Sequence, residues 1–93
     1  MVGSSGGETG VRGFVAAFDA ATGNEAWRTF MTAAPGEPGV DTWPGDSHKQ
    51  GGGSVWITGS YDAATNLSYW GTGNPAPWPT EGRKGDNLYT TSA

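Results

Sequence analysis

Cysteine is absent from the 93 residues, which excludes a disulfide framework and any thiolate metal site within them. Lysine and arginine together number only five and the formal net charge is −4, so no basic surface can neutralise phosphates and nucleic-acid binding is not expected. No apolar run approaches the roughly 20 residues that span a bilayer. The start, Met-Val-Gly-Ser-Ser, lacks the basic and apolar regions of a signal peptide, which in a piece of a longer protein carries no information about the parent.

Glycine and proline are abundant instead, with 17 and 6 residues, and so are large aromatic rings, with five tryptophans. Chains rich in turn formers are often disordered, but disordered segments are poor in aromatic residues because they have nothing to bury. The combination therefore predicts short, well-packed β-strands that are joined by tight loops, and an all-β fold.

The clearest predicted element is a hairpin near the N-terminus. An apolar strand, 14–18 (FVAAF), leads through the turn sequence 19–23 (DAATG) to a second strand, 25–30 (EAWRTF). The second strand alternates, with Trp27 and Thr29 on one face. Alanine-rich stretches also favour helices, but the glycine of the turn interrupts the run and weakens that interpretation.

Turn and loop signals dominate the rest of the chain. The remaining elements are expected in this order: a long irregular loop over 33–53, a strand over 54–61, a turn over 62–66, a returning strand over 67–73, a second irregular loop over 74–87, and a final strand that begins at 88. Irregular loops of this length are uncommon in compact domains and are usually functional.

The two predicted turns share a sequence pattern. Asp-Ala-Ala-Thr-Gly and Asp-Ala-Ala-Thr-Asn each end four residues before a tryptophan, and the copies are offset by 43 residues. Gly23 and Asn66, at the position that varies, are the residue types that most readily adopt a left-handed backbone. The offset matches one four-stranded propeller blade, and blades bury their faces only against neighbours. Unless the two copies arose by chance, the chain is roughly two blades of a larger propeller, with Trp27 and Trp70 packing between blades.

Three stretches resemble one known family. Residues 3–28, 43–56 and 69–78 are similar, in order and spacing, to the pyrroloquinoline-quinone-dependent alcohol dehydrogenases of the methanol/ethanol type. The first hairpin also carries the family's tryptophan-docking motif, A-x-D-x-x-x-G-x-x-x-W, from which the second copy departs at Ser60 and Asn66. The resemblance implies that residues 1–93 are a partial domain of an eight-bladed β-propeller, truncated at both ends. It also implies oxidation of primary alcohols to aldehydes by hydride transfer to metal-bound quinone.

The resemblance further implies which residues bind the cofactor and its metal. The residues that match contacts to the quinone, including the indole beneath its plane, are Ser5, Gly6, Gly7, Ser54 and Trp56. The residues that match metal ligands, for Ca²⁺ or alternatively a lanthanide, are Glu8 and Asn74.

These residue types also suit such a site on chemical grounds. A planar quinone with carboxylates needs an aromatic floor and closely placed N–H donors, which an indole and a Ser-Gly-Gly backbone supply. Ca²⁺ prefers oxygen ligands, among them a carboxylate and an amide carbonyl. Plainer alternatives exist for each: Glu8 as a solvated loop carboxylate, Asn74 as a turn former before proline, and Trp56 as a packing residue.

Other parts of the family's machinery have no match here. The catalytic base, an aspartate in an Asp-x-Trp-Asp segment, would lie outside the window, so no catalytic residue is assigned. The implied partners are a small alcohol and a cytochrome c-type electron acceptor, in the periplasm. The alternative hypotheses are a non-catalytic propeller scaffold and an all-β carbohydrate-binding module. His48 is interpreted as a surface residue, and Arg12 as the partner of a neighbouring carboxylate.

Overall fold

The chain folds into short β-strands and irregular segments, as seen in a computed structural model that describes residues 1–77, 83 and 85–93. Over these residues the elements are β1 (Val2–Gly3), η1 (Gly7–Thr9), β2 (Phe14–Phe18), β3 (Glu25–Phe30), η2 (Val40–Thr42), η3 (Ser47–Lys49), β4 (Ser60–Asp62) and β5 (Leu67–Tyr69). The η elements are single 3-10 turns, so the predicted all-β class is confirmed. In this described part, no helix has the length and apolar character needed to cross a membrane.

The first hairpin has the predicted strand boundaries. β2 pairs antiparallel with β3, in a register that sets Phe14 opposite Phe30, and β1 adds a third strand beside β2. The rings of Phe14 and Phe30 meet edge to face at 6.1 Å between centroids. Trp27 and Thr29 share the other face, as the alternation predicted, and line a cavity of about 340 Å³. The hairpin therefore has two distinct faces. One carries the two phenylalanine rings, and the other lines a cavity together with residues of the second hairpin.

The two repeated turns are built alike. Oδ1 of Asp19 accepts two backbone N–H groups at 2.8 and 2.9 Å, and Oδ1 of Asp62 accepts one at 3.0 Å while its Oδ2 accepts the Thr65 hydroxyl at 2.7 Å. Gly23 (φ 75°) and Asn66 (φ 55°) both take left-handed backbone geometry. The repeat is thus a repeat of structure as well as of sequence, and Trp70 of the second copy lines the same cavity as the tryptophan of the first.

The second hairpin is shorter than predicted. β4 begins only at Ser60 and β5 ends at Tyr69, so the expected strands over 54–61 and 67–73 are wrong in length. Residues 54–59 form no strand, and Gly53, which precedes them, has a left-handed φ of 65°. The expected final strand is also wrong. Tyr89 and Thr91 have φ of 78° and 51°, which no strand accommodates, and the segment forms turns.

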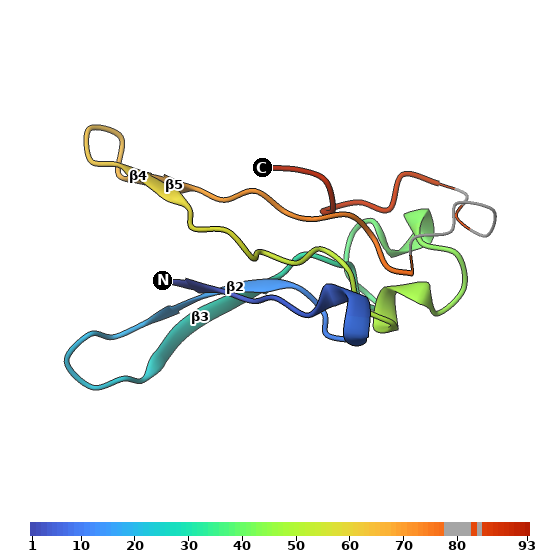
Figure 1. Ribbon diagram of the computed structural model, residues 1–93, viewed down its shortest axis with the longest axis horizontal. Coiled ribbons are helices and arrows are strands. Elements are labelled where there is room, and N and C mark those ends of the chain that lie inside the picture. The colour runs from blue at the N-terminus through green and yellow to red at the C-terminus, as the bar shows by residue number, and fades with distance from the viewer. Residues whose placement is uncertain (78–82, 84) are drawn as a thin grey trace.

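Both hairpins project toward one end of the molecule, and the 3-10 turns gather at the other (Figure 1). Between them runs the central segment, residues 51–55, which is buried along its whole length. The core is otherwise small, and its buried hydrophobic residues are Val15, Ala16, Ala33, Trp43, Val55 and Ala76. Every residue of β3, in contrast, is exposed. The best-buried backbone of the molecule is therefore the glycine-rich segment rather than a strand.

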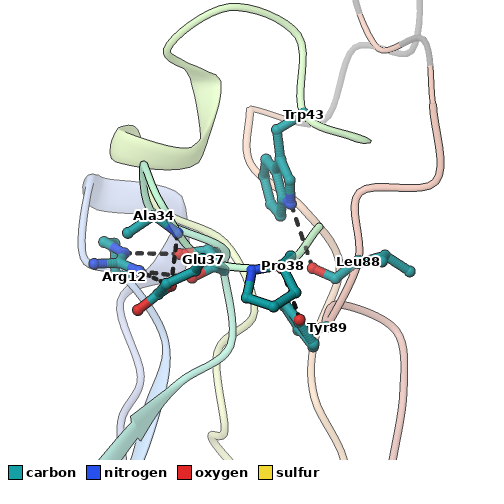
Figure 2. Close-up of polar contacts among 8 residues, drawn as sticks. Arg12, Ala34, Glu37, Pro38, Trp43, Leu88 and Tyr89 are labelled. Carbon is teal, nitrogen blue, oxygen red and sulfur yellow. Dashed lines mark hydrogen bonds and ion pairs between the residues drawn. The ribbon is translucent and has the colours of Figure 1, made fainter. Parts of the chain in front are cut away.

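The long loop over 33–53 is irregular, as predicted, and is anchored by one tryptophan. Trp43 is 3% exposed, and its indole N–H donates to the Leu88 carbonyl at 3.3 Å (Figure 2). The Tyr89 hydroxyl donates to the Pro38 carbonyl at 2.7 Å, also drawn in Figure 2. The loop is thereby held against the C-terminal segment. Of the second predicted loop, 74–87, residues 78–82 and 84 lie outside the described residues.

Candidate functional site

Three segments that are distant in sequence meet at the central segment, through backbone hydrogen bonds. On one side, the Gly52 N–H donates to the Gly7 carbonyl at 3.1 Å, and the Val55 N–H donates to the Ser4 carbonyl at 2.7 Å. These bonds hold the N-terminal segment, which contains Ser5 to Glu8, against residues 51–55.

The C-terminal side of the site is held by the same segment. The Gly53 N–H donates to the Asn74 carbonyl at 3.0 Å, and the Gly73 N–H donates to the Ser54 carbonyl at 2.8 Å. The central segment is therefore sandwiched between two chains, each of which carries residues that the sequence predicts to bind the cofactor or metal.

Glycine is required in the central segment because the neighbouring backbones approach so closely. A Cβ on Gly52 would lie 2.7 Å from the Ala76 nitrogen and 3.0 Å from the Pro75 Cα, and its φ of +99° is itself unfavourable for other residues. A Cβ on Gly51 would overlap the Gly7 carbonyl oxygen. The three segments can meet only because no side chains stand between them.

A cavity of about 360 Å³ opens where these segments meet. Its lining residues are Ser5, Gly6, Glu8, Ser54 and Trp56. Trp56 is 69% exposed, so its indole is not buried against other side chains and can contact a ligand. The N-terminal loop thus contributes a carboxylate and a hydroxyl, the central segment contributes the Ser54 hydroxyl, and the residue after it, Trp56, contributes an aromatic ring.

Ser54 links the two sides of this cavity. It is 5% exposed, and its Oγ accepts the buried Gly7 N–H at 2.8 Å. Gly7 does not line the cavity, and its N–H is directed at the serine. The backbone of Gly7 therefore contributes to the shape of the loop, through Ser54.

Of the two predicted metal ligands, only Glu8 lies at the cavity. Glu8 lines the cavity, whereas Asn74 is exposed and does not, since its amide nitrogen donates to the neighbouring Pro75 carbonyl at 3.0 Å. Only the backbone of Asn74 reaches the central segment, one residue before Ser54. In the described ranges, no group of three or more His, Cys, Asp and Glu side chains is placed to hold a metal ion.

The predictions for Arg12 and His48, which were not assigned to the cofactor site, can also be compared with the structure. Arg12 pairs with a carboxylate as predicted, at 3.9 Å from Glu37. The interpretation of His48 as a surface residue is wrong, because it is 3% exposed and neither ring nitrogen has a hydrogen-bond partner among the described residues. Ser4 was missed: its hydroxyl accepts the Phe14 N–H at 2.8 Å and its carbonyl binds the central segment. The three glycines before Ser54 were the available signal for such a junction.

The described residues thus form two small antiparallel sheets and a cavity beside a glycine-rich junction. Comparison with known proteins gives the family: residues 2–93 match the model of the PQQ family, "Glucose/ethanol/alcohol dehydrogenase, beta-propeller domain", and the chain belongs to it. The resemblance inferred from the sequence and the propeller fold class are thereby confirmed.

Curated relatives are dehydrogenases of the same kind. The chain is 44% identical to "Methanol dehydrogenase [cytochrome c] subunit 1" of Methylobacterium organophilum, over 97% of the chain and 17% of that protein. It is also 44% identical to "Quinohemoprotein alcohol dehydrogenase ADH IIB" of Pseudomonas putida, over 99% of the chain and 15% of that protein. Both alignments run over 108 positions, more than the 93 residues of the chain, so these relatives have residues in this region that the chain lacks.

A solved structure supports the same architecture. "Europium-containing methanol dehydrogenase" superposes with a TM-score of 0.80 at 42% identity, over 94% of the chain and 18% of that structure. The chain thus spans less than a fifth of the length of these relatives.

Proposed function

We propose that this chain forms part of the quinone and metal site of an alcohol dehydrogenase that uses pyrroloquinoline quinone. The observation that carries the proposal is the shared cavity: Ser5, Gly6 and Glu8 from one segment meet Ser54 and Trp56 from another, at the positions that the family resemblance assigns to the cofactor. The match of residues 2–93 to the PQQ dehydrogenase family favours this reading over a carbohydrate-binding module.

The donor set fits the group chemically. The exposed indole of Trp56 offers a flat surface for a planar quinone, and the hydroxyls of Ser5 and Ser54 can donate to its oxygens. Glu8 supplies an anionic oxygen for a hard cation such as Ca²⁺ or a lanthanide. Asn74 would offer its amide oxygen to the same cation, which would require its side chain to turn from the Pro75 carbonyl while its backbone stays bound to Gly53.

In such a site the quinone, when bound, supplies the hydride acceptor and the metal polarises it. The residues of this chain bind and orient. Trp56 would hold the ring and Glu8 would hold the cation, and Ser54 keeps the loop that carries Glu8 in place through the Gly7 N–H. Removal of the substrate's proton falls to a base outside these residues.

The rest of the proposal concerns a longer protein that contains this chain. We expect an eight-bladed propeller that oxidises a small primary alcohol and passes electrons to a cytochrome c-type acceptor in the periplasm. Support comes from relatives whose names include methanol dehydrogenase, cytochrome c and quinohemoprotein, and from the europium-containing structure. The small core and the fully exposed β3 also suit a piece that is covered by neighbouring blades.

The test is cofactor binding by variants of that longer protein. In Glu8→Gln and Asn74→Ala we expect loss of bound metal and at least roughly tenfold weaker quinone binding, because the first removes the negative charge at the cation and the second removes an amide oxygen. Metal content by elemental analysis and quinone affinity by equilibrium dialysis give the two readouts. Glu25→Gln, which removes an exposed carboxylate on β3, is the matched control. Wild-type metal content and quinone affinity in both site variants would refute the assignment.

A further inference from the structure

Arg12 lies outside the cavity, and two nitrogens of its guanidinium group bind neighbouring residues. Its Nε donates to the Thr32 hydroxyl at 2.8 Å, and one terminal nitrogen donates to the Thr32 carbonyl at 2.6 Å. The guanidinium carbon lies 4.2 Å from the centroid of the Phe30 ring. The same terminal nitrogen is 3.9 Å from Glu37, whose carboxylate accepts the Ala34 N–H at 2.7 Å (Figure 2).

The contact with Thr32 is the strongest of these. Thr32 is fully buried, so removing the arginine would leave its hydroxyl and carbonyl oxygens without these donors and without water to replace them. The planar fork of arginine serves two acceptors at once and stacks on an aromatic face, which lysine cannot reproduce. The pair with the exposed Glu37 is long and adds little.

The backbone around Arg12 is part of the glycine junction. Arg12 pairs in parallel with Gly52, and the next residue, Gly13, donates its N–H to the Gly52 carbonyl at 2.8 Å and accepts the Met31 N–H at 2.8 Å. The arginine thus ties the end of β3 to the loop that runs from Ser5 to Gly13. That loop carries the hydroxyl and the carboxylate of the cavity.

We propose that Arg12 is a positioning residue for cofactor binding, which rests on the proposed function. By binding Thr32, it holds the end of the loop that carries Glu8. Without the guanidinium the cavity residues remain, but the loop that holds Glu8 loses the side-chain hydrogen bonds that join it to Thr32, just after β3. Sites of this kind lose affinity when their supporting contacts loosen.

The chain provides a matched control in Arg28. Its guanidinium carbon lies 4.0 Å from the Phe14 ring, the edge-to-face partner of the ring that Arg12 covers. It also pairs with a glutamate, Glu25, at 2.6 Å. Arg28 therefore has the same cation–π contact and the same kind of ion pair, but no contact with Thr32 or the cofactor loop.

The experiment compares Arg12→Met, Arg12→Lys and Arg28→Met in the longer protein. Quinone affinity is measured by titration with pyrroloquinoline quinone in the presence of Ca²⁺, below the unfolding temperature of every variant. The induced circular dichroism of the bound quinone reports its orientation independently of turnover. We expect roughly tenfold weaker binding and an altered dichroism band in Arg12→Met, an intermediate loss in Arg12→Lys, and affinity within about twofold of wild type in Arg28→Met.

Each outcome decides the matter. Equal losses in Arg12→Met and Arg28→Met would show a general effect on stability and overturn the positioning role. Unchanged affinity and dichroism in Arg12→Met would overturn it as well, while leaving the proposed function intact. Failure of the wild-type protein to bind the quinone would instead refute the proposed function, and the role of Arg12 with it.

Discussion

The two hairpins and the central segment are stabilised in opposite ways. In the hairpins the deciding contacts are local, since Asp19 and Asp62 bind backbone and hydroxyl groups within three residues of themselves. In the central segment, residues 51–55, each bond reaches a part of the chain that is distant in sequence, as from Gly52 to Gly7. The hairpin turns and β3 are exposed, whereas the central segment is buried and consists largely of glycine.

The hairpins and the central segment therefore have different requirements on the sequence. The hairpins need only turn chemistry and alternation, and a neighbouring blade can supply the rest of their burial. The cavity needs three backbones within hydrogen-bonding distance, which depends on side chains being absent. We therefore expect substitutions in the central segment to affect stability and cofactor binding together, and substitutions in the hairpin turns to affect stability alone.

The largest effect is expected from Gly52→Ala. The new Cβ would lie 2.7 Å from the Ala76 nitrogen and 3.0 Å from the Pro75 Cα. Both are backbone atoms, which cannot move aside without breaking the junction. We expect a loss of about 3 kcal/mol in the free energy of unfolding, measured by denaturant titration, together with loss of quinone binding.

Gly36→Ala is the control for this substitution. Gly36 has a similar left-handed φ of +87°, but a Cβ there would meet nothing within 4 Å. Alanine there is disfavoured only by the backbone conformation, so we expect a loss of about 1 kcal/mol in the free energy of unfolding. Similar losses in the two variants would contradict the claim that close approach, rather than backbone geometry, makes glycine necessary at Gly52.

Ser54→Ala is expected to have the next largest effect. It leaves the Gly7 N–H buried without its acceptor, which costs about 2 kcal/mol. Because Ser54 also lines the cavity, quinone affinity should fall with stability. Ser54→Thr keeps the hydroxyl and is the matched variant. Full quinone affinity in Ser54→Ala would remove this residue from the proposed site.

Local signals in the sequence were sufficient for the first hairpin. The boundaries of β2 and β3, the two faces of β3, and the left-handed geometry at Gly23 and Asn66 all follow from residue types within a few positions. The residues of the cavity were named from family resemblance, and the structure brings five of the seven together.

The errors in the sequence-based predictions share one physical cause. The segment 54–59 alternates like a strand, but its neighbours are the N-terminal loop and Gly73 rather than a pairing strand, and Gly53 precedes it in left-handed geometry. His48 is buried by tertiary packing, which the residues around it in the sequence did not indicate. The position of Asn74, exposed yet bonded through its backbone, likewise depends on long-range packing.

A smaller effect is expected from exchanging residues at the repeated turn position. Gly23→Asn copies the second turn into the first, and asparagine accepts left-handed geometry, so the unfolding temperature should change little. Gly23→Val places a β-branched side chain there and should cost about 1 kcal/mol. Quinone binding should be unchanged in both, as measured by the same titration. A loss of binding in either would contradict the separation of turns from site.

The smallest effect is expected from the turn carboxylates, and it appears only in acid. The backbone N–H of Thr22 lowers the pKa of Asp19 below its ordinary value, and the Thr65 hydroxyl does the same for Asp62. A carboxyl whose pKa is lowered by folding contributes stability above its unfolded pKa, about 3.9, and that contribution is lost as the pH falls through the folded value. The double variant Asp19→Asn, Asp62→Asn should therefore unfold with a weaker dependence on pH below about 4 than the wild type. Parallel acid-unfolding curves for the two proteins would mean that the turns do not depend on these charges, and the hairpins would then owe less to local contacts than the structure indicates.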